Sequence, residues 1–278
     1  MSIGIKELKK TAADVRLGII EALYNAGSGH PGGSLSAADI VTVLYFDEMN
    51  IDPENPEMDG RDKCVFSKGH AGPAQLSAMA LRGFFPMEDF TGGLRKLGSI
   101  FQGHPNIKIP GIEMSTGSLG QGFSVAGGMA MAGKLDGKDG RIYAVLGDGE
   151  LQEGLVWETA MSAAHYGLDN LVAIVDHNGL QIDGRNDDVM AVNPIGEKFG
   201  GFGWNVISID GHDIEQILDA FAKARECKGK PTVIVAETVK GKGVSFMENQ
   251  AGWHGKAPDG EQYAQAVEEI KAAKAALV

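Results

Sequence analysis

The sequence predicts an α/β fold in which an open, mainly parallel sheet carries helices on both faces. Short apolar runs rich in strand formers alternate along its 278 residues with longer segments whose apolar residues recur at helical spacing. Two of these runs, at residues 141–146 and 171–175, flank a helical segment at 150–166. Because such a crossover returns the chain in the same direction, both runs are expected to end at one edge of a parallel sheet.

The same alternation of helices and strands extends over the rest of the chain. Helices are expected at residues 8–24, 36–46, 118–135, 150–166, 214–227 and 259–277, and a further helix opens at 67–70. Strands are expected at residues 62–66, 141–146, 171–175, 204–209 and 232–236. No internal repeat divides the chain, and a chain of this length buries about three quarters of its unfolded surface. One domain over residues 1–278 is therefore expected.

Composition excludes several classes of protein. The net charge of -12 argues against nucleic-acid binding, which needs a basic face, and leaves phosphate recognition to local groups. Cys64 and Cys227 lack metal-ligand or redox spacing, so a reducing, cytoplasmic setting is expected. Residues 1–10 lack the apolar core of a signal peptide, and the longest apolar stretch, at 123–131, is too short to span a bilayer.

A metal and diphosphate site is predicted where two neighbouring strands end. Asp148 lies in the triplet Gly-Asp-Gly after the first strand, and Asn178 follows the second. Gly-Asp-Gly alone is common turn chemistry, but Asn178 adds a second hard oxygen, and the turn through Leu180 adds a backbone carbonyl. Three protein oxygens are too few for a complete cage, yet they suit a Mg²⁺ ion whose other positions hold phosphate oxygens and water. The pattern therefore predicts a diphosphate anchor.

Glycine-flanked histidines form a second set of candidates. Five of the seven histidines stand beside glycine, and four of these are candidates because their glycine-flanked loops give an imidazole access to a ligand: His30, His70, His104 and His254. Imidazole suits proton transfer near neutral pH because its ordinary pKa is close to 7. No catalytic position is assigned to the remaining histidines, His165, His177 and His212.

Seven motifs, in their order along the chain, resemble those of the transketolase family. They are Ser-Gly-His-Pro-Gly at 28–32, Ser-Lys-Gly-His-Ala at 67–71, Gly-His-Pro at 103–105, Thr-Gly-Ser-Leu-Gly-Gln-Gly at 116–122, Gly-Asp-Gly with Glu-Gly at 147–154, Asn-Gly-Leu-Gln-Ile-Asp-Gly at 178–184 and His-Gly-Lys-Ala-Pro at 254–258. The resemblance covers nearly the whole chain. It implies the diphosphate-binding domain of a thiamine-diphosphate enzyme, with Mg²⁺ or, in its place, Ca²⁺ or Mn²⁺.

The resemblance also implies a role for individual residues. The metal ligands would be the side chains of Asp148 and Asn178 and the carbonyl of Leu180. The cofactor would be bound by His70, Gly117, Leu119, Asp148, Gly149, Asn178 and His254. His30, His104 and His254 would surround the reacting carbons of the sugar. The glycines at 116–122 precede a helix, where backbone N–H groups and the helix dipole favour anions.

Glu153 has two interpretations. By resemblance it joins a proton relay between the two active sites of a dimer, with Glu158 as a supporting candidate. A carboxylate at a helix start is also favoured by the helix dipole, so the plain alternative is a first-turn acidic residue. The glycine-rich loop at 240–243 is likewise interpreted either as a lid over the cofactor or as a solvated turn.

Members of this family usually have more than twice this length. Their second domain supplies the glutamate that activates the aminopyrimidine ring, the aromatic residues that stack on it, and most basic residues for the substrate phosphate. We therefore expect the N-terminal subunit of a split transketolase, in a two-plus-two heterotetramer with a separate C-terminal, pyrimidine-binding subunit. The expected reaction, within pentose phosphate metabolism, transfers a two-carbon ketol unit from a ketose phosphate to an aldose phosphate.

Three alternatives stay open from the sequence. A deoxyxylulose phosphate synthase or a 2-oxo-acid dehydrogenase subunit would share Asp148 and Asn178, although the four histidines favour ketol transfer over the dehydrogenase. A metal-dependent hydrolase is disfavoured because no two histidines have ligand spacing. A non-catalytic cofactor-binding subunit is disfavoured by the intact set of motifs.

Overall fold

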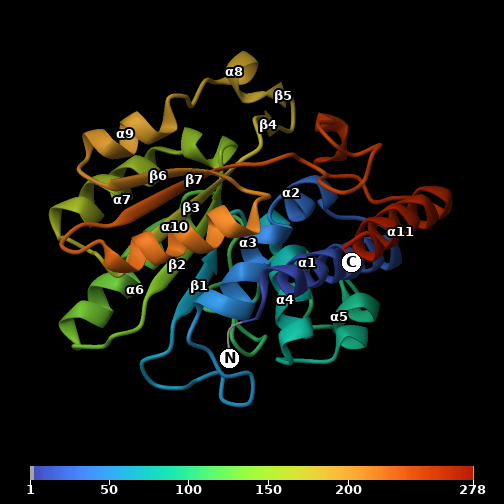
Figure 1. The fold of residues 1–278 in the computed structure, drawn as a ribbon, viewed down its shortest axis with the longest axis horizontal. Helices are drawn as coiled ribbons and strands as arrows, with labels where there is room; N and C mark the ends of the chain where they lie inside the picture. Colours follow the sequence, from blue (N-terminus) through green and yellow to red (C-terminus); the bar gives the residue numbers. More distant parts are fainter. Residues whose placement is uncertain (1–2, 278) are drawn as a thin grey trace.

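The computed structural model describes residues 3–277 and is built on a five-stranded sheet with the strand order β1-β2-β3-β7-β6 (Figure 1). Every neighbouring pair in this sheet is parallel, which confirms the predicted fold class. The strands are β1 (Lys63–Phe66), β2 (Ile142–Gly147), β3 (Leu171–His177), β6 (Asn205–Asp210) and β7 (Thr232–Glu237). A short antiparallel hairpin, β4 (Leu180–Gln181) and β5 (Gly184–Arg185), stands apart from it.

The central strands are apolar throughout because both faces of the sheet are covered. In β2, Tyr143 and Val145 join one hydrophobic core, whereas Ala144 and Leu146 join the other, as the alternation of a strand requires. The first core contains residues of α1 (Ile5–Ala26), α3 (Ala38–Val43), α4 (Gly72–Arg82) and α10 (Ile214–Glu226). The second contains residues of α6 (Gln121–Leu135), α7 (Gly154–His165) and α9 (Ile195–Gly201). The predicted helices on both faces are thus confirmed.

Several boundaries differ from the prediction. The expected helix at 36–46 is divided, since α2 (Pro31–Ser36) precedes α3 and a π-helical turn, η1 (Leu44–Glu48), follows it. The helix expected from residue 150 begins as a 3-10 turn, η3 (Gly149–Gln152), because the extended backbone of Glu153 (φ -76°, ψ 128°) delays α7. The other elements are η2 (Gly69–Ala71), α5 (Met87–Gly93), α8 (Asn186–Val189), η4 (Ala251–Trp253) and α11 (Gly260–Ala275).

A crevice at the carboxyl edge of the sheet follows from the strand order. The chain passes from β2 to β3 through α7, which packs in the second core, and from β6 to β7 through α10, which packs in the first. The chain after β3 continues to α9 in the second core, whereas the chain after β7 returns to the first. Adjacent strands β3 and β7 therefore send their loops to opposite faces, which is where open α/β sheets bind ligands.

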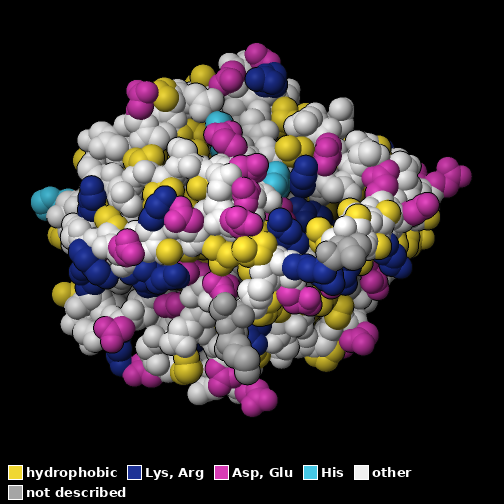
Figure 2. Space-filling view, viewed as in Figure 1, with side chains coloured by type: hydrophobic (Ala, Val, Ile, Leu, Met, Phe, Trp, Pro, Cys, Tyr) yellow, Lys and Arg dark blue, Asp and Glu magenta, His cyan; other side chains and the backbone are white. Residues whose placement is uncertain are grey.

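The surface offers little long-range attraction for an anion. Basic and acidic side chains are interspersed on the face shown in Figure 2, and the chain carries a net charge of -12. An anionic ligand therefore has to be bound by groups inside a site.

Cys64 and Cys227 are both unpaired. Within residues 3–277 no helix has the length and apolar character needed to cross a bilayer. The cytoplasmic setting and the single-domain organisation stay predictions.

Candidate active site

A cavity of about 340 Å³ opens at the carboxyl edge of the sheet. Its walls come from the loops that follow β1, β2, β3 and β7, together with the segments before α2 and α6. Every residue that the sequence analysis assigned to the site lines this cavity: His30, His70, His104, Gly117, Leu119, Asp148, Gly149, Glu153, Asn178, Leu180 and His254. The structure thus brings together residues that are spread over most of the chain.

Asp148 and Asn178 lie side by side because β2 and β3 are paired in register. Gly147 is opposite Asp176, so the residues that follow each strand meet at the edge. The Asp148 carboxylate is buried and accepts the N–H groups of Gly149 at 2.8 Å and Gly179 at 2.5 Å. Burial, followed by the charge of Asp176, raises the pKa of Asp148, so a cation bound beside it would favour its ionised form.

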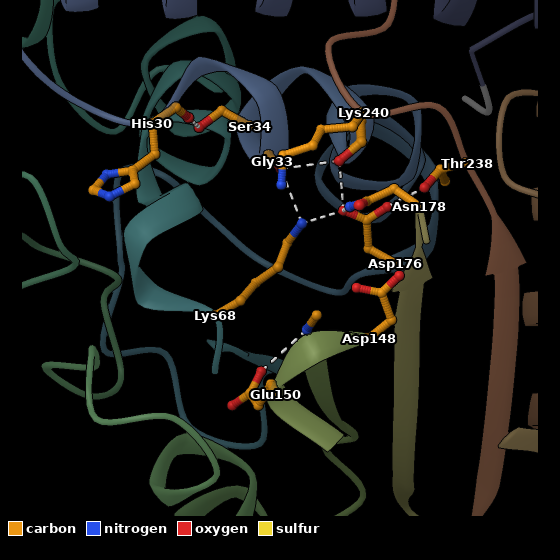
Figure 3. A network of polar contacts seen from close by, with 12 residues as sticks. His30, Gly33, Ser34, Lys68, Asp148, Glu150, Asp176, Asn178, Thr238 and Lys240 are labelled. Carbon is orange, nitrogen blue, oxygen red and sulfur yellow. Dashed lines mark hydrogen bonds and ion pairs between the residues drawn. The ribbon is translucent and has the colours of Figure 1, made fainter. Parts of the chain in front are cut away.

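Asp176 is the most completely buried carboxylate of the site (Figure 3). It forms an ion pair with the buried Lys68, accepts the Ser36 hydroxyl at 2.5 Å and accepts the Thr238 hydroxyl as well. Burial alone would raise the pKa of Asp176, but the Lys68 charge and these donors lower it below its ordinary value. The Lys68 ammonium also donates to the Gly33 carbonyl at 2.9 Å, so this pair ties the ends of β1 and β3 to α2.

Glu150 connects three further segments. Its buried carboxylate accepts the Ser67 hydroxyl, the Gly120 N–H at 2.8 Å and the Gly147 N–H at 3.1 Å. The same Ser67 oxygen accepts the Phe123 N–H at 3.0 Å, which fixes the first turn of α6. Glu150 therefore holds the glycine loop before α6 against the ends of β1 and β2. We refer to Asp148, Glu150 and Asp176 together as the acidic floor.

Opposite them, His30, His70, His104 and His254 form a cluster that we refer to as the histidine wall. Ring centroids are 5.0 Å apart for His70 and His254, 5.3 Å for His30 and His70, 5.5 Å for His30 and His254, and 6.3 Å for His30 and His104. His30 precedes α2, His70 lies within η2, His104 lies in the long loop between α5 and α6, and His254 follows η4. Residues distant in sequence thus present four imidazoles to one cavity.

Burial keeps the histidine wall neutral. It lowers the pKa of His30 to about 4, with a further effect of the Arg95 charge, and the pKa of His254 to about 3, with a further effect of Lys240. Burial also lowers the pKa of His70 and of His104. Near pH 7 each ring therefore has one nitrogen that donates and one that accepts. The Nδ1 of His30 is buried and has no hydrogen-bond partner among the described residues, so the protein leaves one nitrogen of this ring unsatisfied.

Gly117 is required where the glycine loop passes the histidine wall. Its φ of +149° is a backbone conformation that residues with a side chain rarely adopt, and a Cβ there would lie 2.9 Å from Cδ2 of His104.

Glu153 is exposed at the rim of the cavity, and its side chain makes no capping hydrogen bond to α7. Glu158 lines a different hollow, between α6 and α7, so the supporting candidate is not part of this cavity.

Comparison with known proteins identifies the family. Residues 8–275 match the family described as "Transketolase, thiamine diphosphate binding domain". The chain belongs to the transketolase family. It is 42% identical over 266 residues to one subunit of the apulose-4-phosphate transketolase of Phocaeicola vulgatus, with 96% of this chain and 94% of that relative covered. It is also 42% identical to a 6-deoxy-6-sulfo-D-fructose transketolase subunit of a Clostridium species, with 95% of this chain and 96% of that one covered.

A solved transketolase shows the same fold. The structure of the Campylobacter jejuni enzyme superimposes with a TM-score of 0.91 at 34% sequence identity, covering 99% of this chain. This chain spans 46% of that enzyme, so the match lies within one part of a longer transketolase. The family resemblance predicted from the motifs is thereby confirmed, and with it thiamine diphosphate as the cofactor that this domain binds.

Three charged residues that line the transketolase cavity were not assigned to it from the sequence: Lys68, Glu150 and Lys240. A fourth, Asp176, is fully buried and does not line the cavity, but it pairs with Lys68. Lys240 is 1% exposed, and its Nζ lies 3.2 Å from the Leu180 carbonyl and 3.0 Å from Nδ1 of His254. Burial, with the neighbouring Lys68 charge as a further cause, lowers the pKa of Lys240 to about 8. Its loop is therefore packed, and the solvated-turn interpretation is wrong for this residue. A charged residue at the carboxyl end of a buried strand is the sequence signal that identifies Lys68, two residues after β1, and Asp176, near the end of β3.

The oxygens around Asp148 fit a divalent cation that is only partly held by protein. Asp148 offers a carboxylate, Asn178 an amide oxygen and Leu180 a carbonyl, and all three residues line one cavity. No cluster of three or more His, Cys, Asp or Glu residues within 3–277 could hold a metal ion. A hard cation here would thus take its remaining ligands from phosphate and water, as the sequence predicted.

Proposed function

We propose that this chain is the N-terminal, diphosphate-binding subunit of a split transketolase. With a separate subunit, it transfers a two-carbon ketol unit from a ketose phosphate to an aldose phosphate. The match to two relatives named as transketolase subunits, over 94% and 96% of their own lengths, carries this proposal. Because the matched relatives are transketolases, the synthase and dehydrogenase alternatives are not favoured.

Asp148 of the acidic floor would hold the diphosphate end of the cofactor indirectly, through a divalent cation. Asp148 and Asn178 would bind Mg²⁺, or Ca²⁺ or Mn²⁺ in its place, with the Leu180 carbonyl as a third ligand. His70, Gly117, Leu119, Gly149 and His254 line the same cavity and would contact the cofactor beside them. The buried ammonium of Lys240 adds a positive charge next to Leu180, which favours an anionic ligand.

The histidine wall would carry the proton transfers of the reaction. Thiamine diphosphate, when bound, supplies the nucleophilic carbon and the electron sink for carbon–carbon cleavage. His30, His104 and His254 are neutral, so each can accept a proton from a sugar hydroxyl or donate one to a carbonyl oxygen.

A partner subunit would complete the site. By resemblance to longer transketolases, the partner supplies the groups around the aminopyrimidine ring, and the two kinds of subunit form a two-plus-two heterotetramer. Glu153 lies exposed at the rim of the cavity, where it would join a proton relay toward a neighbouring subunit. This exposed position at the rim supports a relay role, while the alternative of an acidic residue favoured by the dipole of α7 stays open.

Reconstitution with a partner tests whether ketol transfer requires both subunits. The chain is assayed alone and with a C-terminal transketolase subunit, using xylulose 5-phosphate and ketoses that carry a sulfonate or a branched skeleton. We expect ketol transfer only when both subunits are present. Ketol transfer by the isolated chain would contradict the proposal.

Calorimetry tests the metal assignment. Asp148→Asn removes the charge and keeps one acceptor oxygen, which can serve either the Gly149 or the Gly179 N–H group but not both. We expect it to weaken Mg²⁺-dependent binding of thiamine diphosphate about 100-fold or more, since even partners outside the ligand shell contribute about 10–100-fold. Asp183→Asn, at the rim of the same cavity, is the control. Unchanged binding by Asp148→Asn would refute the metal site.

A further inference from the structure

A buried network of three charged and polar side chains lies outside the cavity. The Arg16 guanidinium of α1 donates to both oxygens of Asp39 on α3, at 3.1 and 2.6 Å. His212, which follows β6, places its Nδ1 2.7 Å from Oδ2 of Asp39. None of the three residues lines the cofactor cavity. In the sequence analysis, His212 was a histidine without a catalytic position.

The hydrogen bonds of His212 determine which of its nitrogens carries the proton. Nε2 accepts the backbone N–H of Val239 at 2.8 Å, so this nitrogen is unprotonated. The proton is therefore on Nδ1, which donates to Asp39. His212 thus links the buried Asp39 carboxylate to the backbone of the loop that follows β7.

Arg16 contacts the same loop at a second point. Its Nε donates to the Lys242 carbonyl at 3.1 Å. Asp39 therefore holds two side chains, Arg16 and His212, that fix the backbone at residues 239 and 242. Between these two positions lies Lys240, whose ammonium enters the cofactor cavity and contacts Leu180 and His254.

The backbone between the two fixed points has little freedom. The Gly241 N–H donates to the Gly32 carbonyl at 2.9 Å. Gly241 has a φ of +80°, and a Cβ there would lie 2.4 Å from the Met247 carbonyl oxygen. A lysine side chain otherwise has large rotational freedom, so a fixed backbone and a buried stem lower the entropy cost of placing its ammonium.

We propose that Arg16, Asp39 and His212 form a positioning network that holds the 239–242 loop so that the Lys240 ammonium lies in the cofactor cavity. The network touches neither cofactor nor substrate, and it acts through Lys240. This inference rests on the proposed function, because the group that meets Lys240 is the anionic end of thiamine diphosphate. A network with a purely structural role would support the fold without a specific effect on that group.

Two substitutions of His212 separate its two hydrogen bonds. An asparagine amide reaches about as far as Nδ1 of histidine, so His212→Asn keeps the donor to Asp39 and removes the acceptor for Val239. A glutamine amide reaches about as far as Nε2, so His212→Gln keeps an acceptor for Val239 and removes the donor to Asp39. Each variant therefore loses one hydrogen bond of the ring, and only His212→Asn releases the loop.

The test measures the Kd of thiamine diphosphate, with Mg²⁺ present, for the full chain by calorimetry. We expect His212→Asn to raise the Kd on the order of 10-fold, as loss of a supporting partner does in other sites, and His212→Gln to raise it clearly less. In a Lys240→Met background, His212→Asn should add no further loss, since the residue through which it acts is gone. Equal effects of the two variants, or an undiminished effect beside Lys240→Met, would overturn the proposal.

Amide hydrogen exchange provides a readout that needs no cofactor. We expect His212→Asn to speed exchange at residues 239–242 while His212→Gln leaves that segment protected. Unaltered exchange in His212→Asn would overturn the network. If the chain, with these exchange effects intact, bound no thiamine diphosphate at all, the proposed function would fail and the control of the loop by the network would stand.

Discussion

The histidine wall faces the same cavity as Asp148 and Glu150 of the acidic floor, whose third member, Asp176, is fully buried. The polar atoms of the floor and of the wall are satisfied to different degrees. Each carboxylate of the floor accepts at least two donors from the protein, and all three are buried. In the wall, His30 has a buried Nδ1 without a partner among the described residues. Burial lowers the pKa of all four imidazoles and so keeps them neutral.

This difference separates two tasks within one site. A hydrogen-bonded network of buried charges fixes the geometry of the loops that carry it, whereas a neutral imidazole that lines a cavity can exchange a proton with a substrate. Glu150 and Asp176 are therefore the part of the floor that the folded protein completes by itself, whereas Asp148 would be completed by a cation. The wall is the part that a ligand completes. The predictions below test this contrast, from the largest expected effect to the smallest.

Lys68→Met should have the largest effect because it removes the partner of Asp176 and leaves a buried carboxylate without its counter-charge. We expect the free energy of unfolding to fall by about 3–5 kcal/mol, measured by denaturant titration. Lys223→Met is the matched control, because Lys223 pairs with Asp219 on an exposed helix face and should lose no more than about 0.5 kcal/mol. Similar losses for both variants would show that the floor is not a buried ion-pair site.

Glu150→Gln should have an intermediate effect. The amide keeps the size of the side chain but has one acceptor oxygen for the three donors that now meet the carboxylate. We expect the free energy of unfolding to fall by about 1–3 kcal/mol. Glu153→Gln, three residues along and exposed, should change it by less than about 0.5 kcal/mol. Equal losses in the free energy of unfolding for the two variants would show that the hydrogen bonds of the Glu150 carboxylate do not stabilise the acidic floor.

The histidine wall should affect the pH dependence of the free energy of unfolding, and this effect should be smaller than the two above. The pKa of His30 is about 4 in the fold, below its ordinary value of 6.5, so the unfolded chain binds more protons between these values. The stability due to neutral His30 is therefore complete above pH 6.5 and is lost as pH falls toward 4. The raised pKa values of Asp148 and Glu150 act in the opposite direction. Wild type therefore has to be compared with a variant.

We expect His30→Asn to lose less stability than wild type between pH 7 and pH 5, measured from denaturant midpoints at both values. His165→Gln, on an exposed helix end, should keep the wild-type pH dependence. Identical pH dependence in wild type and His30→Asn would show that burial does not hold this ring neutral.

The sequence predicted the parts of the fold that depend on local pattern. The β2 and β3 strands are continuous apolar runs, so their ends, and with them Asp148 and Asn178, fell within a residue or two of the expected positions. Glycine beside His30, His70, His104 and His254 marked loops that reach a ligand. The short helices α5, α8 and α9 were not predicted because one or two turns are too few to show a helical period.

The contacts that hold the site together depend on pairing across the chain. Lys68 and Asp176 are 108 residues apart, and neither residue's neighbours indicate the other as its partner. His212 and Asp39 are 173 residues apart, and Lys240 appeared only as part of a glycine-rich loop. A one-dimensional pattern places each charge at a strand end, but the register and order of the strands decide which charges meet.

The composition of the acidic floor links ligand occupancy to the folding of the whole sheet. Asp176 is contacted by Ser36, Lys68 and Thr238, which belong to segments that meet only after β1, β3 and β7 have paired. A partly folded chain in which any one of these strands is unpaired would lack part of this set of contacts to Asp176. Coenzyme present at 100 times its Kd should therefore add about 2.7 kcal/mol to global stability and delay melting of the entire domain as a unit.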